Sequence, residues 1–339
     1  MSGLRRSPRL KTKATHPSDS ESGIAFLPDE SLISIFSILP VKSRCRAARV
    51  CRRWHALIKD KSLWKNVSII GTIKHRSLAK VLLFVQTYLM DNLETLVLHH
   101  VSNKILQHLS QNCPKLRALS LKGKDLKTTD LAHLPPQLLE LRLISYQFAT
   151  NWYCSLTQGL LYQIETLEVF CPHITNNTLG HLATLRTLKS LQLVSCRSSV
   201  VDESEGTYTE RGFACLVQQL TELRVLRFQQ CTQLSDTAFY RIGSSLVKLE
   251  ELTLHSCCNI TDVGLKHLKN LKSLKILDLG GGSPVSPEAL MEVVHSLKGL
   301  KELWIFDTDN IRQQHIDEIK SSEPGLAVYV KDRWDSLQF

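Results

Sequence analysis

The sequence predicts an α/β solenoid, a curved parallel sheet with helices on its outside, preceded by a small all-α module. Two observations lead to this fold class. The pattern Leu-x-x-Leu-x-Leu, with conservative replacements, occurs nine times from Leu93 to Ile305, and successive copies begin 22 to 35 residues apart. A different apolar pattern, with the spacing of helices, occupies residues 27–64. Together they indicate a small helical domain followed by a long repetitive one.

The repeated motif ends with the period of two that a half-buried strand requires, so its last two apolar residues share one face. Helical patterns lie between the motifs, and the clearest of them open at Asp236, Asp262 and Pro287. Strand, turn and helix repeated in this way are typical of a leucine-rich-repeat solenoid. Neighbouring repeats must stack, because a single repeat cannot bury both of its faces.

The two patterns divide the chain into five segments. We expect a disordered basic tail at 1–23, a helical module at 24–70, a linker helix at 71–92, about nine repeats at 93–325 with an insertion near 197–210, and a C-terminal cap or tail at 326–339. The insertion follows from the single spacing of 35 residues, and residues 198–210 hold acidic but no basic side chains. Two interpretations of this insertion are kept: an acidic loop that contacts a partner, and a surface loop that is merely tolerated.

The charge distribution separates the two domains. The chain of 339 residues has 42 Lys and Arg against 32 Asp and Glu, a net charge of +10. Residues 24–70 hold nine basic and three acidic residues, whereas residues 71–339 hold 28 and 27. A long phosphate-binding groove in the repeats is therefore not expected, and we expect no nucleic-acid partner.

Cysteine use and hydropathy bear on the compartment. Ten cysteines without any Cys-x-x-Cys pair fit free thiols in a reducing environment. The longest apolar run, Val81 to Met90, is too short to span a bilayer, so we expect no membrane partner. A basic cluster from Arg5 to Lys13 is compatible with nuclear import. We expect a protein of the nucleus and cytoplasm.

No pattern of residues points to catalysis, and we expect no catalytic residue, metal or cofactor. Neither G-x-S-x-G nor H-E-x-x-H occurs. Cys196, Cys231 and Cys257 each follow a predicted strand, where a stack of small buried thiols is the alternative to a metal site. Residues 280–282 are glycines between a strand and a helix; because no Lys-Ser/Thr follows, a wide turn competes with a phosphate loop.

The helical module carries the most specific resemblance. The stretch from Leu27 to Pro40, the stretch from Ala48 to Leu57 and the pair Leu63-Trp64 resemble an F-box. With the repeats behind it, residues 27–320 are similar to the F-box/leucine-rich-repeat family. That resemblance implies a non-catalytic substrate receptor of an SCF-type ubiquitin ligase. Its partners would be a Skp-family adaptor, which binds a cullin–RING scaffold, and a protein substrate held by the repeats.

The resemblance also implies which residues meet the adaptor. By their match to the F-box positions these are Leu27, Pro28, Ile35, Phe36, Leu39, Pro40, Val50, Cys51, Trp54 and Trp64. The alternative is that some of them, Ile35, Leu39 and Trp64 above all, only build the core of the module. Arg44 and the neighbouring basic residues would meet an acidic adaptor surface or form a solvated helix face.

Geometry selects candidates for substrate binding. Residues between and just after the last two apolar positions of each motif line the concave face, where large aromatic residues and arginine dominate interfaces. On this ground we predict Phe170, Arg227, His255, Trp304 and Phe306. For Trp304 and Phe306 the alternative is burial under the terminal segment 326–339 as an end cap.

Two other classes of function remain open from sequence. One is a ligase-independent leucine-rich-repeat scaffold or enzyme inhibitor. This hypothesis leaves the F-box pattern without a function. The other is a nucleic-acid-associated protein acting through the basic tail, whose binding would collapse with salt.

Overall fold

The computed structural model describes residues 23–70, 78–99, 101–123, 131–145, 153–157, 163–170, 174–194, 208–229, 232–256, 258–282, 284–306, 308 and 310–330. The chain forms two compact units, residues Met1–Leu63 and Trp64–Phe339. Several predictions fall outside the described residues: the basic tail up to residue 22, residues 195–207 of the insertion, the segment 331–339, and Cys196, Cys231 and Cys257.

The first unit is all-helical, as predicted. It contains a 3₁₀ turn η1 (Gly23–Phe26), then α1 (Asp29–Ser37), α2 (Val41–Ala47) and α3 (Arg52–Leu57), and a 3₁₀ turn η2 (Lys61–Trp64) that reaches the second unit. Pro28 and Pro40 occupy the N-caps of α1 and α2, where a missing N–H costs no hydrogen bond. Phe36 is buried, and its ring meets that of Trp54 edge to face at 5.1 Å.

Arg44 of α2 ties the first unit together. It is buried, and its guanidinium donates to the carbonyl oxygens of Phe36 at 3.0 Å, Leu39 at 2.8 Å and Ser37 at 2.6 Å, and also to that of Leu63. Burial lowers the pKa of Arg44. The expectation of an exposed arginine was wrong, because the carbonyl groups at the C-terminal end of α1 and just after it need donors inside the unit.

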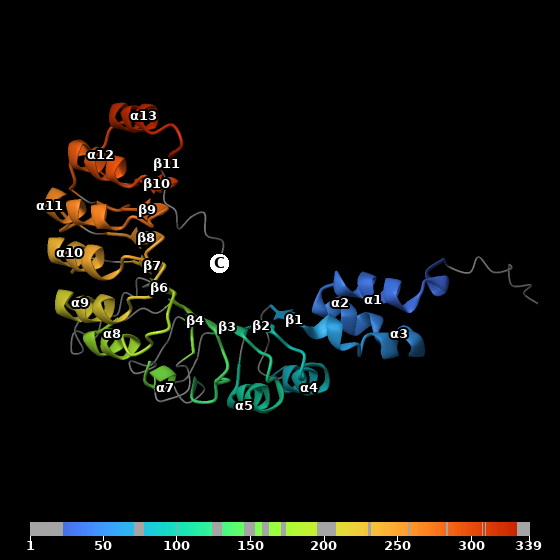
Figure 1. The fold of residues 1–339 in the computed structure, drawn as a ribbon. Coiled ribbons are helices and arrows are strands. Elements are labelled where there is room, and N and C mark those ends of the chain that lie inside the picture. Colours follow the sequence, from blue (N-terminus) through green and yellow to red (C-terminus); the bar gives the residue numbers. More distant parts are fainter. Residues whose placement is uncertain are drawn as a thin grey trace, which may run out of the picture. The chain divides into compact units, whose positions relative to one another are not determined.

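The second unit is built on a sheet of eleven parallel strands that lie in chain order (Figure 1). The strands are β1 (Asn66–Ile69), β2 (Thr95–His99), β3 (Ala118–Gly123), β4 (Glu140–Ser145), β5 (Thr166–Phe170), β6 (Ser190–Val194), β7 (Val225–Phe228), β8 (Glu251–Leu254), β9 (Ile276–Asp278), β10 (Glu302–Trp304) and β11 (Ala327–Tyr329).

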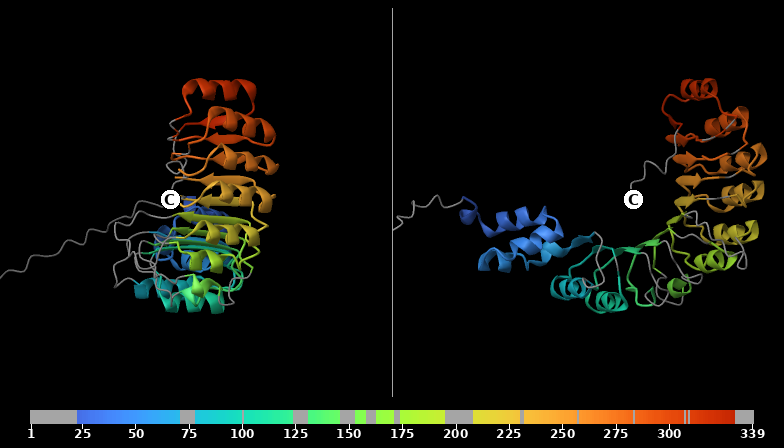
Figure 2. Two further views of the ribbon diagram at one scale, coloured as in Figure 1. Left: turned by 90° about the vertical axis from the view of Figure 1, so that its left-hand side faces the viewer. Right: turned by 180° about the vertical axis from the view of Figure 1, so that it is seen from behind.

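Helices cover one face of this sheet (Figures 1 and 2). They are α4 (Leu78–Tyr88), α5 (Asn103–Asn112), α7 (Cys154–Thr157), α8 (Asn176–Leu182), α9 (Glu210–Gln219), α10 (Asp236–Ser245), α11 (Asp262–Leu265) with the 3₁₀ turn η5 (Lys266–Asn270), α12 (Pro287–Ser296) and α13 (Gln313–Ser322). The other face, which we call the open face, carries the side chains predicted to bind a substrate. The predicted solenoid, a parallel sheet with helices on its outside, is confirmed.

The register explains why the motif repeats. The second apolar residue of every motif lies in one row across the sheet and is buried: Leu96, Leu119, Leu141, Leu167, Leu191, Leu226, Leu252, Leu277 and Leu303. Each leucine thus packs on the leucine of the repeat before and after it. Stacking of repeats is the source of the core.

The sheet extends beyond the nine motifs at both ends. Val67 and Ile69 of β1 pair in register with Leu96 and Leu98, so the strand lies inside the segment 24–70. Trp64 takes the place of the first leucine and is buried, with its ring 5.3 Å from that of Phe84 in α4. The helix expected as a linker therefore packs against the sheet as part of a further repeat. At the other end, β11 lies inside the segment 326–339.

Consecutive repeats are also joined by a ladder of helix caps, in which the first residue of one helix accepts hydrogen bonds from the N-cap of the next. Asp236 Oδ1 accepts from the Thr261 N–H at 2.8 Å, and Asp262 Oδ1 from the Ser286 N–H at 2.7 Å. The hydroxyl groups of Thr261 and Ser286 donate to the second carboxylate oxygens, each at 2.7 Å. We call this set the cap ladder.

Glycine residues 280–282 follow β9 as a turn. Gly281 and Gly282 both have a φ of +86°, a conformation that favours glycine. This is the wide-turn alternative of the sequence analysis.

Among the described residues, no helix combines the length and the apolar character needed to cross a bilayer.

Candidate functional site

The first candidate surface is a set of exposed apolar side chains on the helical unit. Phe26, Ile38 and Val50 expose 67%, 81% and 64% of their surface, and Ile24 is also exposed. A small unit that leaves this much apolar surface in solvent has the character of a docking surface. Ile38 stands at the C-cap of α1, so the helix ends with its side chain outside the core.

The structure divides the ten residues predicted to meet an adaptor. Pro28, Pro40, Val50 and Cys51 are exposed. A second group is half-buried: Leu27, Ile35, Leu39 and Trp54. Phe36 and Trp64 are buried, and Trp64 belongs to the repeat unit. Those two side chains build cores. Sequence reasoning missed Ile24, Phe26 and Ile38, because the spacing of apolar residues marks a helix and not which side of it is covered.

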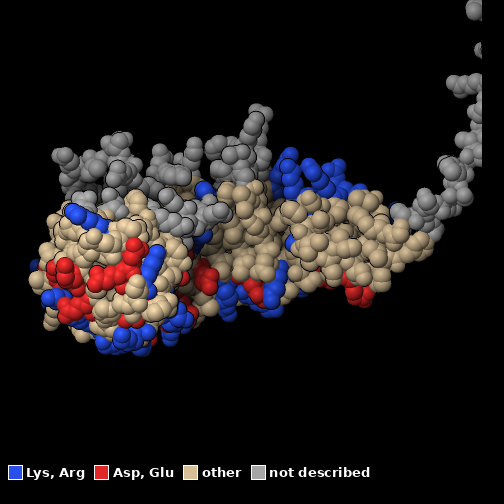
Figure 3. Space-filling view, turned by 90° about the horizontal axis from the view of Figure 1, so that it is seen from above, with Lys and Arg blue, Asp and Glu red and all other residues tan. Residues whose placement is uncertain are grey.

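The helical unit is also the basic part of the chain. Figure 3 shows Lys and Arg side chains gathered on one face near this unit, while both signs mix over the repeats. Lys42, Arg46, Arg49 and Arg52 are exposed. Arg53 is held by Asp29, with Nη2 2.7 Å from Oδ1. The exposed cations suit an acidic partner surface.

The second candidate surface is the open face of the sheet, which begins with a hollow over β2–β5. Its volume is about 320 Å³, and its lining includes the small side chains Thr95, Ala118 and Ser120. Arg142 and Glu168 form an ion pair at its border, with Nε 3.0 Å from Oε2. The hollow exists because short side chains occupy the open face of the two neighbouring strands β2 and β3.

Phe170 lies beside this hollow and is buried. It packs with Val194 and with the half-buried Ile144 in a small apolar cluster on the open face. The guanidinium carbon of Arg142 lies 5.5 Å from the Phe170 ring centroid, within cation–π range. The structure thus places this predicted residue in a packed cluster.

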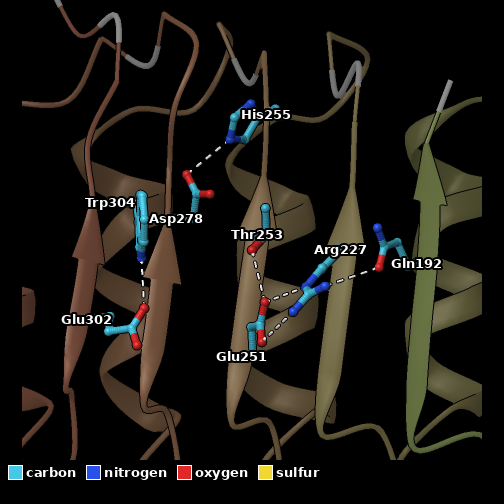
Figure 4. Close-up of polar contacts among 8 residues, drawn as sticks. All are labelled: Gln192, Arg227, Glu251, Thr253, His255, Asp278, Glu302 and Trp304. Carbon is cyan, nitrogen blue, oxygen red and sulfur yellow. Dashed lines mark hydrogen bonds and ion pairs between the residues drawn. The ribbon is translucent and has the colours of Figure 1, made fainter. Parts of the chain in front are cut away.

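The open face continues over β6–β10 as a polar network (Figure 4). Arg227 of β7 holds Glu251 of β8 with two hydrogen bonds, of which Nη2 to Oε2 measures 3.0 Å. Its Nη1 donates to Gln192 Oε1 of β6 at 3.2 Å. Glu251 and Gln192 are buried. The bidentate pair fixes the Arg227 side chain and satisfies the buried carboxylate.

His255 and Asp278 form a second buried pair. His255 Nε2 lies 3.1 Å from Asp278 Oδ1, and the same oxygen accepts from the Gly280 N–H at 3.2 Å. Relative exposure is 7% for His255 and 1% for Asp278. Asp278 also lines the open face. The sequence analysis did not select it, because it chose only large side chains such as aromatic residues and arginine.

Trp304 and Phe306 differ in exposure. The Trp304 ring is buried, stacks on Tyr329 of β11 with centroids 4.0 Å apart, and donates from Nε1 to Glu302 Oε2 at 3.0 Å. Tyr329 belongs to the segment 326–339, so one face of Trp304 is covered as in the end-cap alternative. Phe306 is 38% exposed and remains available on the surface.

Among the described residues, no group of three or more His, Cys, Asp or Glu side chains is placed to hold a metal ion. The cysteines in the described part of the chain, such as Cys113 and Cys215, are free thiols.

A helical F-box unit in front of a leucine-rich-repeat solenoid defines the class of this protein. Residues 24–70 match the F-box-like family. The relatives that match most of the chain are F-box/LRR-repeat proteins. It is 29% identical over 302 residues to F-box/LRR-repeat protein 12 of Homo sapiens, covering 84% of this chain and 88% of that one. The F-box/LRR-repeat protein 12 of Bos taurus is 28% identical over 304 residues, covering 85% and 88%.

Among solved structures, the chain is similar to one described as a complex of Rad7 and Elc1 in yeast. The TM-score is 0.40 at 15% sequence identity, covering 95% of this chain and 100% of that one. Similarity this distant adds nothing to the likeness that the sequence relatives show.

Proposed function

We propose that this chain is the substrate-recognition subunit of an SCF-type E3 ubiquitin ligase. The helical unit binds a Skp-family adaptor, the adaptor binds a cullin–RING scaffold, and the open face of the repeats binds a protein substrate for ubiquitination and degradation. The observation that carries the proposal is the F-box-like unit at residues 24–70 with its exposed Phe26, Ile38 and Val50. Burial of such side chains favours association with a partner.

The chain itself needs no catalytic group for this role. A receptor raises the effective concentration of substrate lysines near the ubiquitin thioester that other subunits supply. A binding face that keeps its shape is the property required. The register of eleven strands and the polar network over β6–β10 support that rigidity.

We propose that the substrate lies on the open face and includes contacts with the predicted residues Phe170, Arg227, His255, Trp304 and Phe306. Phe306 offers exposed aromatic surface, whereas the other four shape and stiffen the face beneath. We also propose action in the nucleus and cytoplasm, which the free thiols of the described cysteines support.

The test is affinity capture from cells with matched variants of the helical unit. Ile38→Asp places a charge on the most exposed apolar side chain, and Leu27→Ala with Pro28→Ala alters the start of α1. Ala56→Asp, at an exposed position of α3, is the control. We expect adaptor and cullin to be captured by wild type and the control, and to be lost at least tenfold with Ile38→Asp.

Capture of neither adaptor nor cullin by the wild-type chain would overturn the proposal. A ligase-independent scaffold or inhibitor would then be the leading function. Equal capture by wild type and Ile38→Asp would show that the exposed apolar set is not the docking surface.

A further inference from the structure

The C-terminal part of the open face is acidic. Its three carboxylates are Glu251 on β8, Asp278 on β9 and Glu302 on β10. The open-face positions of these strands contain no Lys or Arg. Arg227 neutralises Glu251 through its bidentate contact. In the described part of the chain, no lysine or arginine forms an ion pair with Asp278 or Glu302, so this part of the face retains negative charge.

Asp278 has one oxygen that nothing in the described chain satisfies. Its Oδ1 accepts from both His255 and the Gly280 N–H. Its Oδ2 is buried and has no hydrogen-bond donor among the described residues. A carboxylate oxygen removed from water without a donor is costly, and such groups are rare in folded proteins. This oxygen is therefore a candidate for a donor supplied by another molecule.

The surroundings of Asp278 favour a long side chain with a cationic end. His255 and the Gly280 N–H both occupy Oδ1, which leaves Oδ2 as the acceptor. Phe306 lies close by, because a Cβ built on Gly280 would stand 3.2 Å from His255 Cε1 and 3.3 Å from Phe306 Cβ. The exposed Phe306 ring can cover the apolar stem of a lysine or arginine while its charged end reaches a carboxylate.

We propose that Asp278, which lies opposite Trp304 with Glu302 and Phe306 two residues to either side of that tryptophan, binds an arginine or lysine side chain of the protein substrate. This inference rests on the proposed function, because it places the substrate on the open face. A charge-assisted hydrogen bond to Oδ2 satisfies the buried oxygen and compensates the charge of the acidic strands. The class of substrate is thus one that presents a basic residue in an accessible segment.

The experiment uses the full-length chain and four pools of synthetic nonapeptides whose central residue is arginine, lysine, citrulline or glutamate, with mixed neutral flanks. Citrulline has nearly the shape of arginine without its charge. We expect wild type to retain the arginine or lysine pool at least fivefold more than the citrulline and glutamate pools. This comparison needs no variant and does not depend on whether a mutant folds.

Two variants localise the effect. Asp278→Asn removes the charge with almost no change of shape, and we expect the preference for basic pools to vanish. Glu288→Gln is the matched control, since Glu288 is an exposed carboxylate in the first turn of α12, away from the open face. Glu288→Gln is expected to keep the preference.

If wild type retains neither the arginine pool nor the lysine pool above the citrulline pool, the proposal is overturned. An unchanged basic preference in Asp278→Asn would overturn it as well. Capture of adaptor and cullin by Asp278→Asn is measured in parallel. Its persistence shows that the proposed ligase role stands whichever way the peptide experiment falls.

Discussion

His255 Nε2 lies 3.1 Å from Asp278 Oδ1, and the pair joins the residue that follows β8 to the end of β9 on the open face. The contact depends on Gly280, because a Cβ at that position would lie 3.1 Å from His255 Nε2. The ring occupies the space that a side chain at residue 280 would need. Residue 280 must therefore be glycine, because the His255 ring that binds Asp278 passes close to its Cα.

Gly280→Ala is expected to displace the His255 ring and weaken its bond to Asp278. The loss of a buried hydrogen bond together with local overpacking is expected to lower the free energy of unfolding by about 1–3 kcal/mol. Urea denaturation measures this loss, and NMR of the His255 ring nitrogens reports the bond itself. Gly180→Ala in α8 is the control, because a Cβ there meets nothing within 4 Å. The control is expected to be neutral or stabilising.

An unchanged His255 spectrum in Gly280→Ala would contradict this account of the glycine. It would mean that the ring and the new methyl group are accommodated together by a shift of Phe306, the other neighbour of that position.

Arg44→Met is expected to loosen the helical unit. Four carbonyl groups lose the donor that joins them, and hydrogen bonds of a charged group contribute about 1.5–3 kcal/mol each relative to their absence. Hydrogen exchange read by mass spectrometry is expected to show faster exchange over residues 29–63. Adaptor capture should fall although Ile38 and Val50 are untouched. Arg46→Met, at an exposed position on the same helix, is the comparison.

Slower or equal exchange over residues 29–63 in Arg44→Met would show that packing of Phe36 and its neighbours holds the unit without the guanidinium.

The repeat architecture was predictable from sequence because its cause is local and periodic. Every motif places a leucine in the same buried row, so spacing alone reveals the stack. The repeat that contains β1 was not predicted, because Trp64 stands there in place of the first leucine. Its ring is buried by Phe84 and Tyr88 of α4. Aromatic partners from a helix farther along the chain leave no periodic signal.

The candidate site was predictable only in part. The open-face positions follow from alternation along a strand, so Arg227, His255 and Asp278 were all known to line that face. Which of them pair is decided across strands and by side-chain length. Arg227 reaches diagonally to Glu251, and His255 reaches to Asp278 over a glycine. A rule that selects large or aromatic residues passes over a short buried carboxylate.

The cap ladder predicts that the repeats unfold together. Asp262→Ala removes the acceptor of the Ser286 N–H and hydroxyl in the next repeat. We expect the free energy of unfolding to fall by about 1–3 kcal/mol, the range of caps and charged hydrogen bonds. Chemical denaturation measures it. Glu288→Ala removes an exposed carboxylate from the first turn of α12 and is expected to cost about 0.5 kcal/mol.

Equal losses for Asp262→Ala and Glu288→Ala would show that the acidic residue acts through the helix dipole alone and that the contact between repeats contributes nothing.

Cys113, at the C-cap of α5, is expected to be protected from alkylation while exposed cysteines react. Burial, and secondarily the charge of Asp91, raises the pKa of Cys113 from its ordinary value of 9.0 to about 11. Its side chain is fully buried, whereas Cys215 and Cys258 are exposed. Because the thiolate is the reactive form, iodoacetamide at pH 8 should label Cys215 and Cys258 well before Cys113. Mass spectrometry of digested protein gives the order, and labelling in urea should remove the difference.

The same shift makes stability depend on pH in a definite direction. The folded-state pKa lies above the unfolded value, so the folded chain holds this proton more tightly. The contribution is fully present below pH 9.0 and is lost as pH rises through about 11. Cys113→Ala lacks the titrating group, and its free energy of unfolding should decline less than that of wild type over this window. Parallel declines in the two proteins would show that other groups carry the alkaline loss and that the Cys113 thiol titrates alike in both states.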